Sequence, residues 1–447
     1  MLIVTHDVVD TRVSGPGMRC LEFSRALARD LEVTLASPYE SSLSGLAFRM
    51  ARYSELRPQS LQALLEANDV ALISGYMVDK FAFLRTTSTR LIIDLIAPFI
   101  LENLHYHLDE PVETREGFIR HAVEVTNQLA QVGDFFICGS ERQRDFWLGV
   151  LAANQRLNPH TAPPDSNGHK LIDIVGFGIP ERPPVQRRPV LRDAHPRFGP
   201  DSKIVWWGGG AWDWLDPLTL VRAWPRVIER HPEARLVFPR TQPNPLVPQA
   251  RKALEAERLA TEMGERDRTI FALEWLSYED RESLLCEAQV GVVLHPLHLE
   301  TRFSVRTRVL DYIWASLPIL ITEGDTMSEL VREKRLGRVV PPQDPGAVAE
   351  ALGELLQRPK TDWAPAFAAY AESVRWPRVV QPIRRYCLEG AYAPDRWKRQ
   401  AVGPAALRTG SGQPSWLARA LKAWRIHGPR QALAHAHKLL RWQLFRR

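Results

Sequence analysis

Two arginines and several hydroxyl groups lie close together in the run FSVRTRVLDYIWASLPILIT, residues 303–322. The guanidinium groups of Arg306 and Arg308 each present paired N–H donors that match phosphate oxygens in charge and geometry. Apolar residues recur at helical spacing over Val305–Trp314, so the sequence predicts a helix there with Ser304 as its N-cap. The free N–H groups at the start of that helix would add to an anion site. The run therefore predicts binding of a diphosphate.

A purely structural role for the same arginines remains open at this stage. Both could lie on a solvated helix face, or pair with the carboxylates of Glu300 and Asp311. The β-favouring residues Ile319–Thr322, which follow Pro318, predict a short buried strand after the helix in either case.

A second anion site is indicated by the run VWWGGGAWDWLDP, residues 205–217. An apolar strand is predicted to end at the glycines Gly208, Gly209 and Gly210, and Asp216 is expected to cap a helix that Pro217 begins. Such a loop presents backbone N–H groups to a phosphate. The neighbouring tryptophans could line a sugar or base pocket, although some must belong to the core.

A second glycine-rich loop, SGPGMR, follows the first predicted strand and opens a helix. Gly15 and Gly17 would let a ligand approach the backbone closely, and Arg19 adds a positive charge. An ordinary tight turn explains this short run equally well. It is not a dinucleotide-binding fingerprint, because the G-x-G-x-x-G spacing is missing.

Two series of alternating strands and helices must position these loops. The predicted strands are Leu2–Thr5, Glu32–Ser37, Val70–Ser74, Leu91–Asp94 and Phe135–Cys138 in the first series, and Ile204–Trp207, Arg235–Phe238, Ile270–Leu273, Gly291–Leu294, Ile319–Thr322 and Arg338–Val340 in the second. This alternation predicts an α/β protein with two Rossmann-like, doubly wound parallel sheets facing one another across a cleft. Residues 178–203, rich in proline and arginine, have the composition of a linker.

Composition and charge exclude several classes of protein. The chain has 447 residues, of which 45% are hydrophobic and 25% charged, as expected for a globular protein of two domains. The net charge is +6, but residues 398–447 carry eleven basic and no acidic side chains, so the remainder carries −5. The basic charge therefore belongs to the tail and does not indicate a body that binds nucleic acid.

The cellular setting is predicted from the same data. The four cysteines are widely separated, no secretory signal is recognised at the N-terminus, and no apolar run is long enough to span a bilayer, so a cytoplasmic protein is expected. Two basic amphipathic helices predicted over Trp416–His427 and Arg430–Phe445 would dock either on the anionic inner face of a membrane or on a partner protein.

The chain resembles glycosyltransferase family 4, retaining enzymes of the GT-B fold that use nucleotide sugars. The resemblance runs from Met1 to about Tyr392 and is carried by SGPGMRCLEFSRALA, FFICGSERQRDFW, VGFGIP, EWLSYEDRESLLCEAQVGVVLHP and the run of residues 303–322. It implies an acceptor-binding domain over residues 1–180 and a donor-binding domain over 181–375. A packing helix over 376–400, which could cross back to the first domain, and a basic helical tail over 401–447 complete the expected organisation.

The resemblance also implies roles for individual residues. Residues expected at the donor diphosphate are Gly208, Gly209, Gly210, Ser304, Arg306, Thr307, Arg308 and Arg240. Asp311 stands at the second acidic position of the family's E-x7-E signature and is expected at the ribose, with Leu276 at the nucleobase. Gly15, Gly17 and Arg19 are expected on the acceptor side. Phe303 occupies the first acidic position, unless Glu300 reaches the same space, and the family's usual Arg and Lys after the first strand of this domain are missing.

The implied activity is transfer of a sugar from a nucleoside diphosphate to a glycan or lipid-linked hydroxyl acceptor, in assembly of surface polysaccharide or glycoconjugate. No metal and no cofactor are expected, no nucleic acid is expected as a partner, and no catalytic base is assigned. The altered acidic and basic positions leave a catalytically impaired nucleotide- or glycan-binding subunit as an alternative, and a GT-B sugar-nucleotide epimerase as another. The sugar, base and acceptor are not determined.

Overall fold

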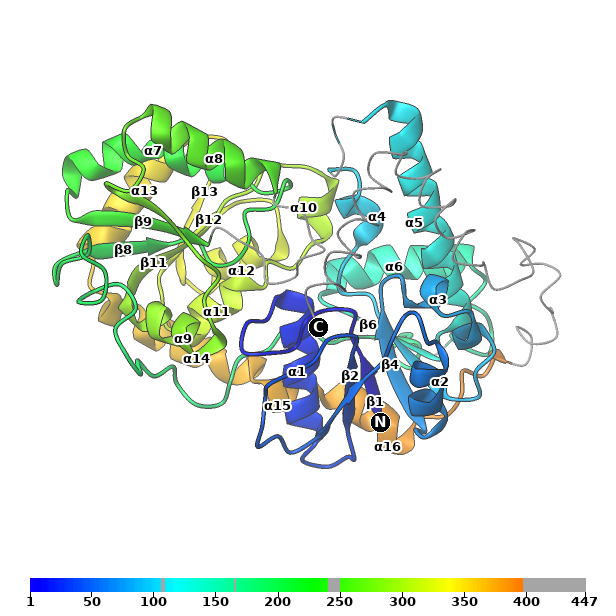
Figure 1. Ribbon diagram of the computed structural model, residues 1–447. Helices are drawn as coiled ribbons and strands as arrows, with labels where there is room; N and C mark the ends of the chain where they lie inside the picture. Colours follow the sequence, from blue (N-terminus) through cyan, green and yellow to red (C-terminus); the bar gives the residue numbers. More distant parts are fainter. Residues whose placement is uncertain (106–107, 109, 165, 240–249, 397–447) are drawn as a thin grey trace.

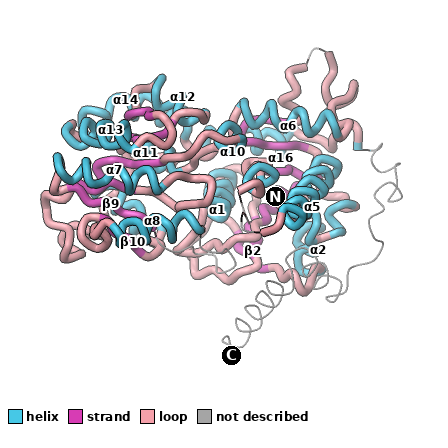
Figure 2. The backbone as a smooth tube through the Cα atoms, turned by 90° about the horizontal axis from the view of Figure 1, so that it is seen from above, coloured by secondary structure: helices cyan, strands magenta, loops and turns pink. Residues whose placement is uncertain are grey.

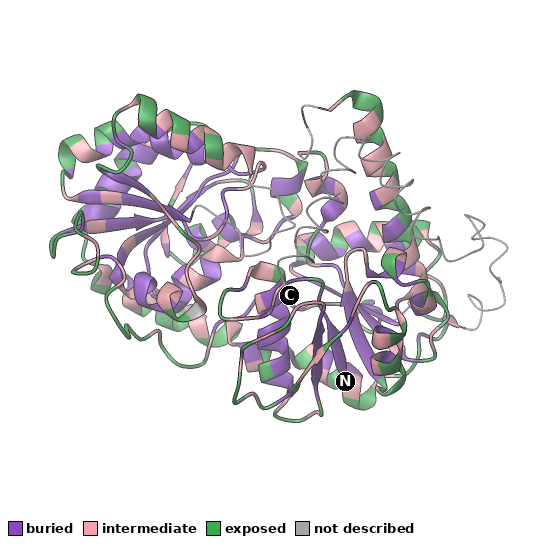
Figure 3. Cartoon of the chain, viewed as in Figure 1, coloured by how far each residue is buried: buried purple, intermediate pink, exposed green. Residues whose placement is uncertain are grey.

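The computed structural model describes residues 1–105, 108, 110–164, 166–239 and 250–396. Arg240 and the basic tail over 401–447 lie outside this range. Two separate parallel sheets form the two bodies seen in Figure 1, and the cores of both are buried between strands and helices (Figure 3). The predicted fold of two Rossmann-like sheets is confirmed.

The first sheet has seven parallel strands in the order β3-β2-β1-β4-β5-β6-β7. Its strands are β1 (Leu2–Val4), β2 (Thr34–Ser37), β3 (Arg49–Arg52), β4 (Val70–Ser74), β5 (Arg90–Asp94), β6 (Phe135–Cys138) and β7 (Ile172–Ile174). Its helices are α1 (Gly15–Leu27), α2 (Gln59–Glu66), α3 (Met77–Lys80), the 3-10 turn η1 (Ala82–Arg85), α4 (Phe99–Glu102), α5 (Val112–Val132) and α6 (Glu141–Ala153).

The second sheet has six parallel strands in the order β10-β9-β8-β11-β12-β13. Its strands are β8 (Lys203–Trp206), β9 (Ala234–Pro239), β10 (Ile270–Leu273), β11 (Ala288–Val293), β12 (Ile319–Thr322) and β13 (Gly337–Val340). Its helices are α7 (Pro217–Arg230), α8 (Arg251–Glu262), α9 (Tyr278–Glu287), α10 (Leu299–Phe303), α11 (Arg308–Trp314), α12 (Thr326–Glu333), α13 (Pro345–Gln357), η2 (Lys360–Trp363), α14 (Ala364–Ala371) and η3 (Glu372–Val374). Two further helices, α15 (Trp376–Val379) and α16 (Gln381–Glu389), follow in the chain.

Both strands that the sequence did not predict are edge strands. β3 has exposed arginines at its two ends, and β7 has only three residues, so neither carries a buried apolar run. An edge strand is covered on fewer sides than a central strand, so it needs fewer apolar residues and is harder to predict from hydrophobic patterns. The predicted central strands differ from the observed ones only at their ends.

The predicted helix over Val305–Trp314 is wrong in its first turn. The chain instead forms α10, which ends at Phe303 with Ser304 as its C-cap, and then α11, which begins at Arg308 after the N-cap residue Thr307. The helical spacing was correct for α11 because Val309, Leu310, Ile313 and Trp314 all face the core. Ser304 therefore ends α10 and is not the N-cap of the following helix that the sequence predicted.

The proline-rich linker is held against the second domain. Backbone N–H groups of Val190, Leu191 and Arg192 donate to the buried carboxylate of Glu287, at 2.6, 3.0 and 3.0 Å. Glu282, also buried, accepts from the N–H of Val185 at 2.6 Å. These contacts fasten much of the predicted linker, residues 178–203, to α9 of the second domain.

The crossing between the two bodies lies at Ile179. Its N–H donates to the carbonyl of Val374 at 2.9 Å, and its carbonyl accepts from the N–H of Trp376 at 3.0 Å. A Cβ on Gly178 would lie 2.6 Å from the Trp376 ring, so glycine permits this close crossing. The outgoing and returning chains meet here, which makes this pair the natural pivot.

After the second sheet the chain returns to the first body, where α15 packs on α1 and α16 continues from α15 (Figure 1). The rings of Phe23 and Trp376 meet edge to face at 5.8 Å, and those of Phe135 and Tyr386 stack at 4.8 Å. Beyond α16, Arg156 and Asp395 form an ion pair at 2.9 Å that is almost fully buried. The last described residues therefore stabilise the first domain.

Substituting Asp395→Ala should lower the free energy of unfolding by about 3–5 kcal/mol, because it leaves the Arg156 guanidinium buried without its counter-charge. Urea denaturation of the whole chain measures the effect. The matched control is Glu389→Ala on the exposed surface of α16, which should change stability by less than about 0.5 kcal/mol. Equal losses in the two variants would contradict a structural role for the buried pair.

Candidate functional site

The carboxyl ends of both sheets face one another, which is where parallel α/β sheets bind ligands. A Cβ on Gly139, directly after β6, would lie 2.8 Å from the side chain of Val305 in the second domain. The rings of Phe146 and Phe303 lie 5.0 Å apart across the same junction. Figure 2 shows α10 between the two bodies, near α6. The predicted loops therefore converge on an interdomain site.

The glycine loop follows β8 at this edge. Gly209 has a φ of +81°, a conformation that favours glycine, while the N–H of Gly208 already donates to the Tyr312 hydroxyl at 2.8 Å. The N–H groups of Gly209 and Gly210 make no hydrogen bond within the part of the chain that the structure describes. The loop can thus offer two amides to a ligand, one fewer than the sequence suggested.

Asp216 caps α7 as predicted. Its carboxylate accepts from the N–H of Thr219 at 3.0 Å and from the hydroxyl of the same residue at 2.6 Å. Its own N–H donates to the carbonyl of Leu294, at the end of β11, at 2.8 Å. The cap therefore ties the glycine loop to the neighbouring strand and limits how far the loop can move.

Tyr312 on α11 fixes the other side of the loop and was not identified from the sequence. Its hydroxyl accepts from Gly208 and donates to the carbonyl of Val292 at 2.9 Å. The ring passes over Gly291, where a Cβ would lie only 2.5 Å from it. Burial raises the pKa of Tyr312, so the hydroxyl stays protonated and neutral. Nothing in the sequence indicated this contact, because a tyrosine one helical turn after an arginine is a common pattern and Gly291 lies in a different segment.

Arg308 is the cation that the structure places at the glycine loop. Its Nη2 donates to the carbonyl of Gly210 at 2.7 Å, and its guanidinium lies 5.3 Å from the centre of the Trp207 ring. Its Nη1 atom is buried and has no hydrogen-bond partner among the described residues. Burial lowers the pKa of Arg308 to about 10, which leaves it charged at neutral pH. A buried charged donor without an acceptor is suited to an incoming anion.

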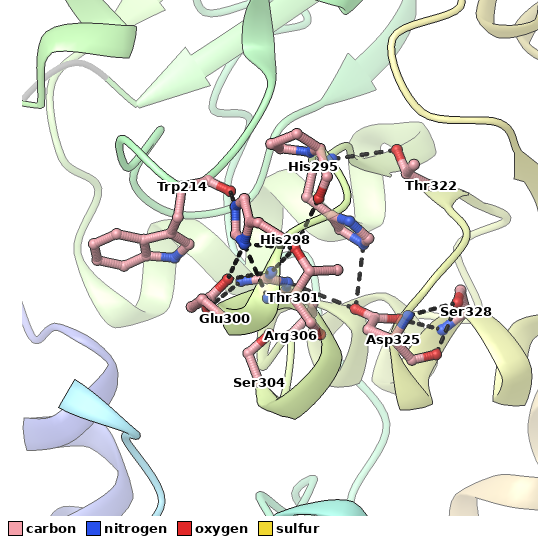
Figure 4. A network of polar contacts seen from close by, with 11 residues as sticks. Trp214, His295, His298, Glu300, Thr301, Ser304, Arg306, Thr322, Asp325 and Ser328 are labelled. Atoms are coloured by element: carbon pink, nitrogen blue, oxygen red, sulfur yellow. Dashed lines mark hydrogen bonds and ion pairs between the residues drawn. The ribbon is translucent and has the colours of Figure 1, made fainter. Parts of the chain in front are cut away.

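Arg306, two residues earlier, is engaged in a structural ion pair. Its Nη1 and Nη2 donate to the two carboxylate oxygens of Glu300 at 2.9 and 2.8 Å, and both residues are at most 5% exposed (Figure 4). The predicted donor role of Arg306 therefore gives way to the structural alternative, pairing with Glu300. Glu300 in turn has its charge neutralised, and Ser304 beside them is buried and contacts the carbonyl of Thr301 at 3.4 Å.

A second carboxylate, Asp325, completes this buried network. Its Oδ1 accepts from the N–H of Ser328 at 2.6 Å to cap α12, and its Oδ2 lies 3.3 Å from His295 Nε2 and 3.6 Å from Arg306 Nε (Figure 4). Burial alone would raise the pKa of Asp325, but the contact with His295 and the charge of Arg306 hold it below the usual value. The network joins α10, α12 and the end of β11 into one unit.

Asp311 points from α11 toward the junction of the domains. Its Oδ2 lies 3.2 Å from Nη1 of Arg281, which itself lies 3.1 Å from the sulfur of Met18 on α1. Burial raises the pKa of Asp311, against the effect of Arg281 and Arg308. Leu276, just after β10, packs partly buried against the core of the same domain. The structure thus places Asp311 and Leu276 at one sheet edge with the glycine loop.

Arg19, predicted on the acceptor side, is instead a structural residue. It is 1% exposed, and its Nε donates to Asp94 at 2.6 Å while Nη1 and Nη2 donate to the carbonyls of Gly176 and Val175 at 2.5 and 2.6 Å. Arg19 therefore fastens α1 to the ends of β5 and β7. Its buried position leaves no route to an acceptor.

The two predicted glycines lie in the first turn of α1 rather than in a loop before it. A Cβ on Gly17 would lie 2.5 Å from the carbonyl of Val8, so this glycine allows α1 to approach the preceding loop. A Cβ on Gly15 would meet no atom within 4 Å. Only Gly15 faces open space where an acceptor could approach.

Three residues at the junction were missed by the sequence reasoning. The rings of His105 and His298 lie 4.0 Å apart, across the two domains. Glu102, at the end of α4, is half-buried near Glu300 and Arg306, and burial together with the charge of Glu300 raises its pKa to about 7. Burial lowers the pKa of His298 to about 4, so its ring is neutral. These residues lie in separate segments of the sequence, so no motif or regular spacing predicts that they meet in the fold.

Within the described ranges, no group of three or more His, Cys, Asp or Glu side chains is arranged to hold a metal ion. In the same ranges no helix is both long and apolar enough to cross a membrane.

The sequence profile of the family "Glycosyl transferases group 1" matches residues 202–358, which include the second sheet and the glycine loop. No curated protein sequence matches the chain. The fold is similar to that of several solved structures at low sequence identity.

One such structure is WaaG, a glycosyltransferase involved in lipopolysaccharide biosynthesis, with a TM-score of 0.59, 14% identity, and coverage of 87% of this chain and 100% of that one. Another is Alr3699/HepE from Anabaena in complex with UDP and glucose, with a TM-score of 0.60, 11% identity and coverage of 86% and 97%. A third is sucrose-phosphate synthase from Thermosynechococcus elongatus, with a TM-score of 0.56, 16% identity and coverage of 86% and 96%.

These likenesses cover nearly the whole chain but show the fold alone, whereas the profile match concerns the sequence of the second domain. The profile match thus assigns residues 202–358 to the glycosyl transferases group 1, and the two facing sheets together have the GT-B fold of the similar structures.

Proposed function

We propose that this nucleotide-sugar-dependent glycosyltransferase binds its donor in the second domain and transfers the sugar, with retained anomeric configuration, to a hydroxyl group held by the first domain. The unpartnered Nη1 of Arg308, beside the free amides of Gly209 and Gly210, is the observation that carries the proposal. The same guanidinium donates through Nη2 to the carbonyl of Gly210, so the cation and the two amides belong to one loop region after β8. A diphosphate there would complete their hydrogen bonds.

The remaining predicted donor residues take narrower roles in this proposal. Asp311 would accept hydrogen bonds from the ribose hydroxyls, which requires the carboxylate to share or release its contact with Arg281. Thr307 precedes Arg308 and would lie near the diphosphate, while the backbone near Leu276 would face the base. UDP-glucose is the first donor to test, because the structurally similar HepE has been solved with it.

In the reaction, the acceptor oxygen bonds to the anomeric carbon as the bond from that carbon to the diphosphate breaks. The acceptor's proton passes to the departing phosphate oxygen, so no protein base is needed. Arg308 and the loop amides stabilise the negative charge that develops on the diphosphate. Enzymes of this group are typically metal-independent, and turnover is expected to survive EDTA.

A lipid-linked or glycan acceptor of surface polysaccharide assembly fits this proposal, since WaaG is involved in lipopolysaccharide biosynthesis. The tail over 401–447 would hold the enzyme on an anionic membrane or on a partner protein. A catalytically impaired binding subunit is the second candidate. It is favoured by Phe303 at the first acidic position and by the neutralisation of Glu300 by Arg306.

Substituting Arg308→Gln should weaken binding of the donor nucleotide by about 1.5–3 kcal/mol, some ten- to hundredfold, because a charged donor to the diphosphate is lost. Calorimetric titration of UDP and UDP-glucose measures this loss of affinity, with GDP, ADP and dTDP as alternative nucleotides.

A turnover assay tests the reaction itself. Release of free nucleoside diphosphate only when acceptor is present would establish transfer. Release without acceptor, or binding without turnover, would support the epimerase or the impaired subunit. Unchanged nucleotide affinity in Arg308→Gln would reject the site.

Arg306→Ala is expected to behave differently from the Arg308 variant. It leaves Glu300 buried without its counter-charge and should lower the free energy of unfolding by about 3–5 kcal/mol. The double variant Glu300→Leu with Arg306→Met removes both charges and should recover most of that loss, as measured by urea denaturation. A stable Arg306→Ala protein with weakened nucleotide binding would restore the original donor role of Arg306.

Glu102 predicts a pH effect on turnover. Because its pKa is raised to about 7, the closed junction favours the protonated acid, and this advantage is lost as the pH rises from the usual carboxyl range through 7. Above that pH ionised Glu102 adds a partly desolvated negative charge beside the Glu300–Arg306 pair, so activity should decline. Glu102→Gln should flatten this decline in the pH–rate profile of kcat/KM. A profile that keeps the same alkaline limb in the variant would contradict the assignment.

A further inference from the structure

An arginine-lined groove of about 570 Å³ lies on the second domain, away from the interdomain junction. Its cationic side chains are Arg332, Arg335, Arg338 and Arg358, and Asp362 is its single acidic one. These residues come from the C-terminal ends of α12 and α13 and from the start of β13. The groove is therefore at the amino edge of the sheet, opposite the carboxyl edge that faces the first domain.

Arg335 is placed in the groove at some conformational cost. Its φ is +56°, in the left-handed region where glycine or asparagine normally follows a helix. Its guanidinium group is exposed and forms no ion pair with any described residue. The left-handed backbone at this position directs the exposed Arg335 side chain alongside the other arginines that line the groove.

Trp363 also lines the groove, and its indole N–H is a second feature that suits an anion. It is 4% exposed, and its Nε1 donor has no hydrogen-bond partner among the described residues. The guanidinium carbons of Arg358 and Arg338 lie 4.4 and 5.8 Å from its ring. An indole N–H buried without an acceptor normally finds one, and here the neighbouring cations favour an anionic acceptor.

The other arginines have partners that an incoming anion could replace. Arg332 lies 3.3 Å from Glu323, Arg338 2.7 Å from Glu354, and Arg358 3.4 Å from Asp362. All three pairs are about half exposed, and pairs of this kind contribute little to stability in water. A phosphate ester carries a charge of about −1.5 to −2 and three acceptor oxygens, so it could accept from more than one of these guanidinium groups at once.

We propose that this groove is a second ligand site that binds a phosphate-bearing small molecule, with Arg335 and the Nε1 of Trp363 as its main donors. The volume exceeds that of a bare phosphate and is within the range of pockets that hold small organic ligands. The ligand is therefore a phosphate ester, either a nucleotide or a sugar phosphate. The site is separate from the donor site because the two lie at opposite ends of the strands.

Titration calorimetry with pyrophosphate tests the proposal on the full chain. The wild type should bind pyrophosphate at two sites. The Arg308→Gln variant should still bind pyrophosphate in the groove, and the Arg335→Gly variant should still bind it at the donor site. Affinity at the groove should fall about tenfold or more in Arg335→Gly and in Trp363→Phe, since each loses a donor to the anion. Arg335→Gly should melt at the same or a higher temperature, because glycine relieves the left-handed backbone.

Gln343→Gly is the matched control, since Gln343 is an exposed residue with a φ of +55°. It should leave both pyrophosphate sites unchanged. Titration of a nucleoside monophosphate and of glucose 1-phosphate then distinguishes a nucleotide from a sugar phosphate, because the true class of ligand should bind the groove more tightly. An unaltered two-site isotherm in Arg335→Gly, or a wild type with only the site that Arg308→Gln removes, would overturn the groove proposal. Neither result would affect the donor assignment.

Discussion

The buried ion pair between Arg306 and Glu300 determines how the donor side of this protein is arranged. A guanidinium that is 5% exposed must be neutralised, and two parallel hydrogen bonds to one carboxylate do so within a single domain. The geometry of that pair breaks the chain between α10 and α11. Arg308, the next arginine, then begins its own short helix and points toward the glycine loop. Two arginines two residues apart thus differ in their surroundings, because Arg306 is matched by a carboxylate and the Nη1 of Arg308 has no partner among the described residues.

The glycine loop depends on the same arrangement. Tyr312 is carried on α11 with Arg308, so its hydroxyl holds Gly208 while the arginine reaches Gly210. Gly291 provides the space for the tyrosine ring in the middle of β11. One short helix therefore sets the distance between the cation and the loop amides, and the buried network around Asp325 and His295 fixes the elements on either side.

The contact between the domains is mainly one of aromatic and ionisable side chains at the carboxyl edges. Phe146 meets Phe303, His105 meets His298, and Glu102 lies near Glu300. The two chain crossings at Ile179 and Trp376 are close together, whereas the proline-rich segment that follows is bound to α9 through Glu282 and Glu287. The covalent link between the domains is therefore confined to the crossing and is not a long free linker.

The sequence alone determined the two parallel sheets, the central strands, the cap at Asp216 and the glycine loop, because hydrophobic periodicity and turn chemistry are local properties. It could not decide which arginine binds an anion. That choice depends on whether a carboxylate from another turn or helix reaches the guanidinium, as Glu300 reaches Arg306 and Asp94 reaches Arg19. It likewise could not reveal Tyr312, Glu102 or the groove at Trp363, whose partners come from distant segments. Burial and pairing are set by tertiary packing, and only packing decides which charges remain available to a ligand.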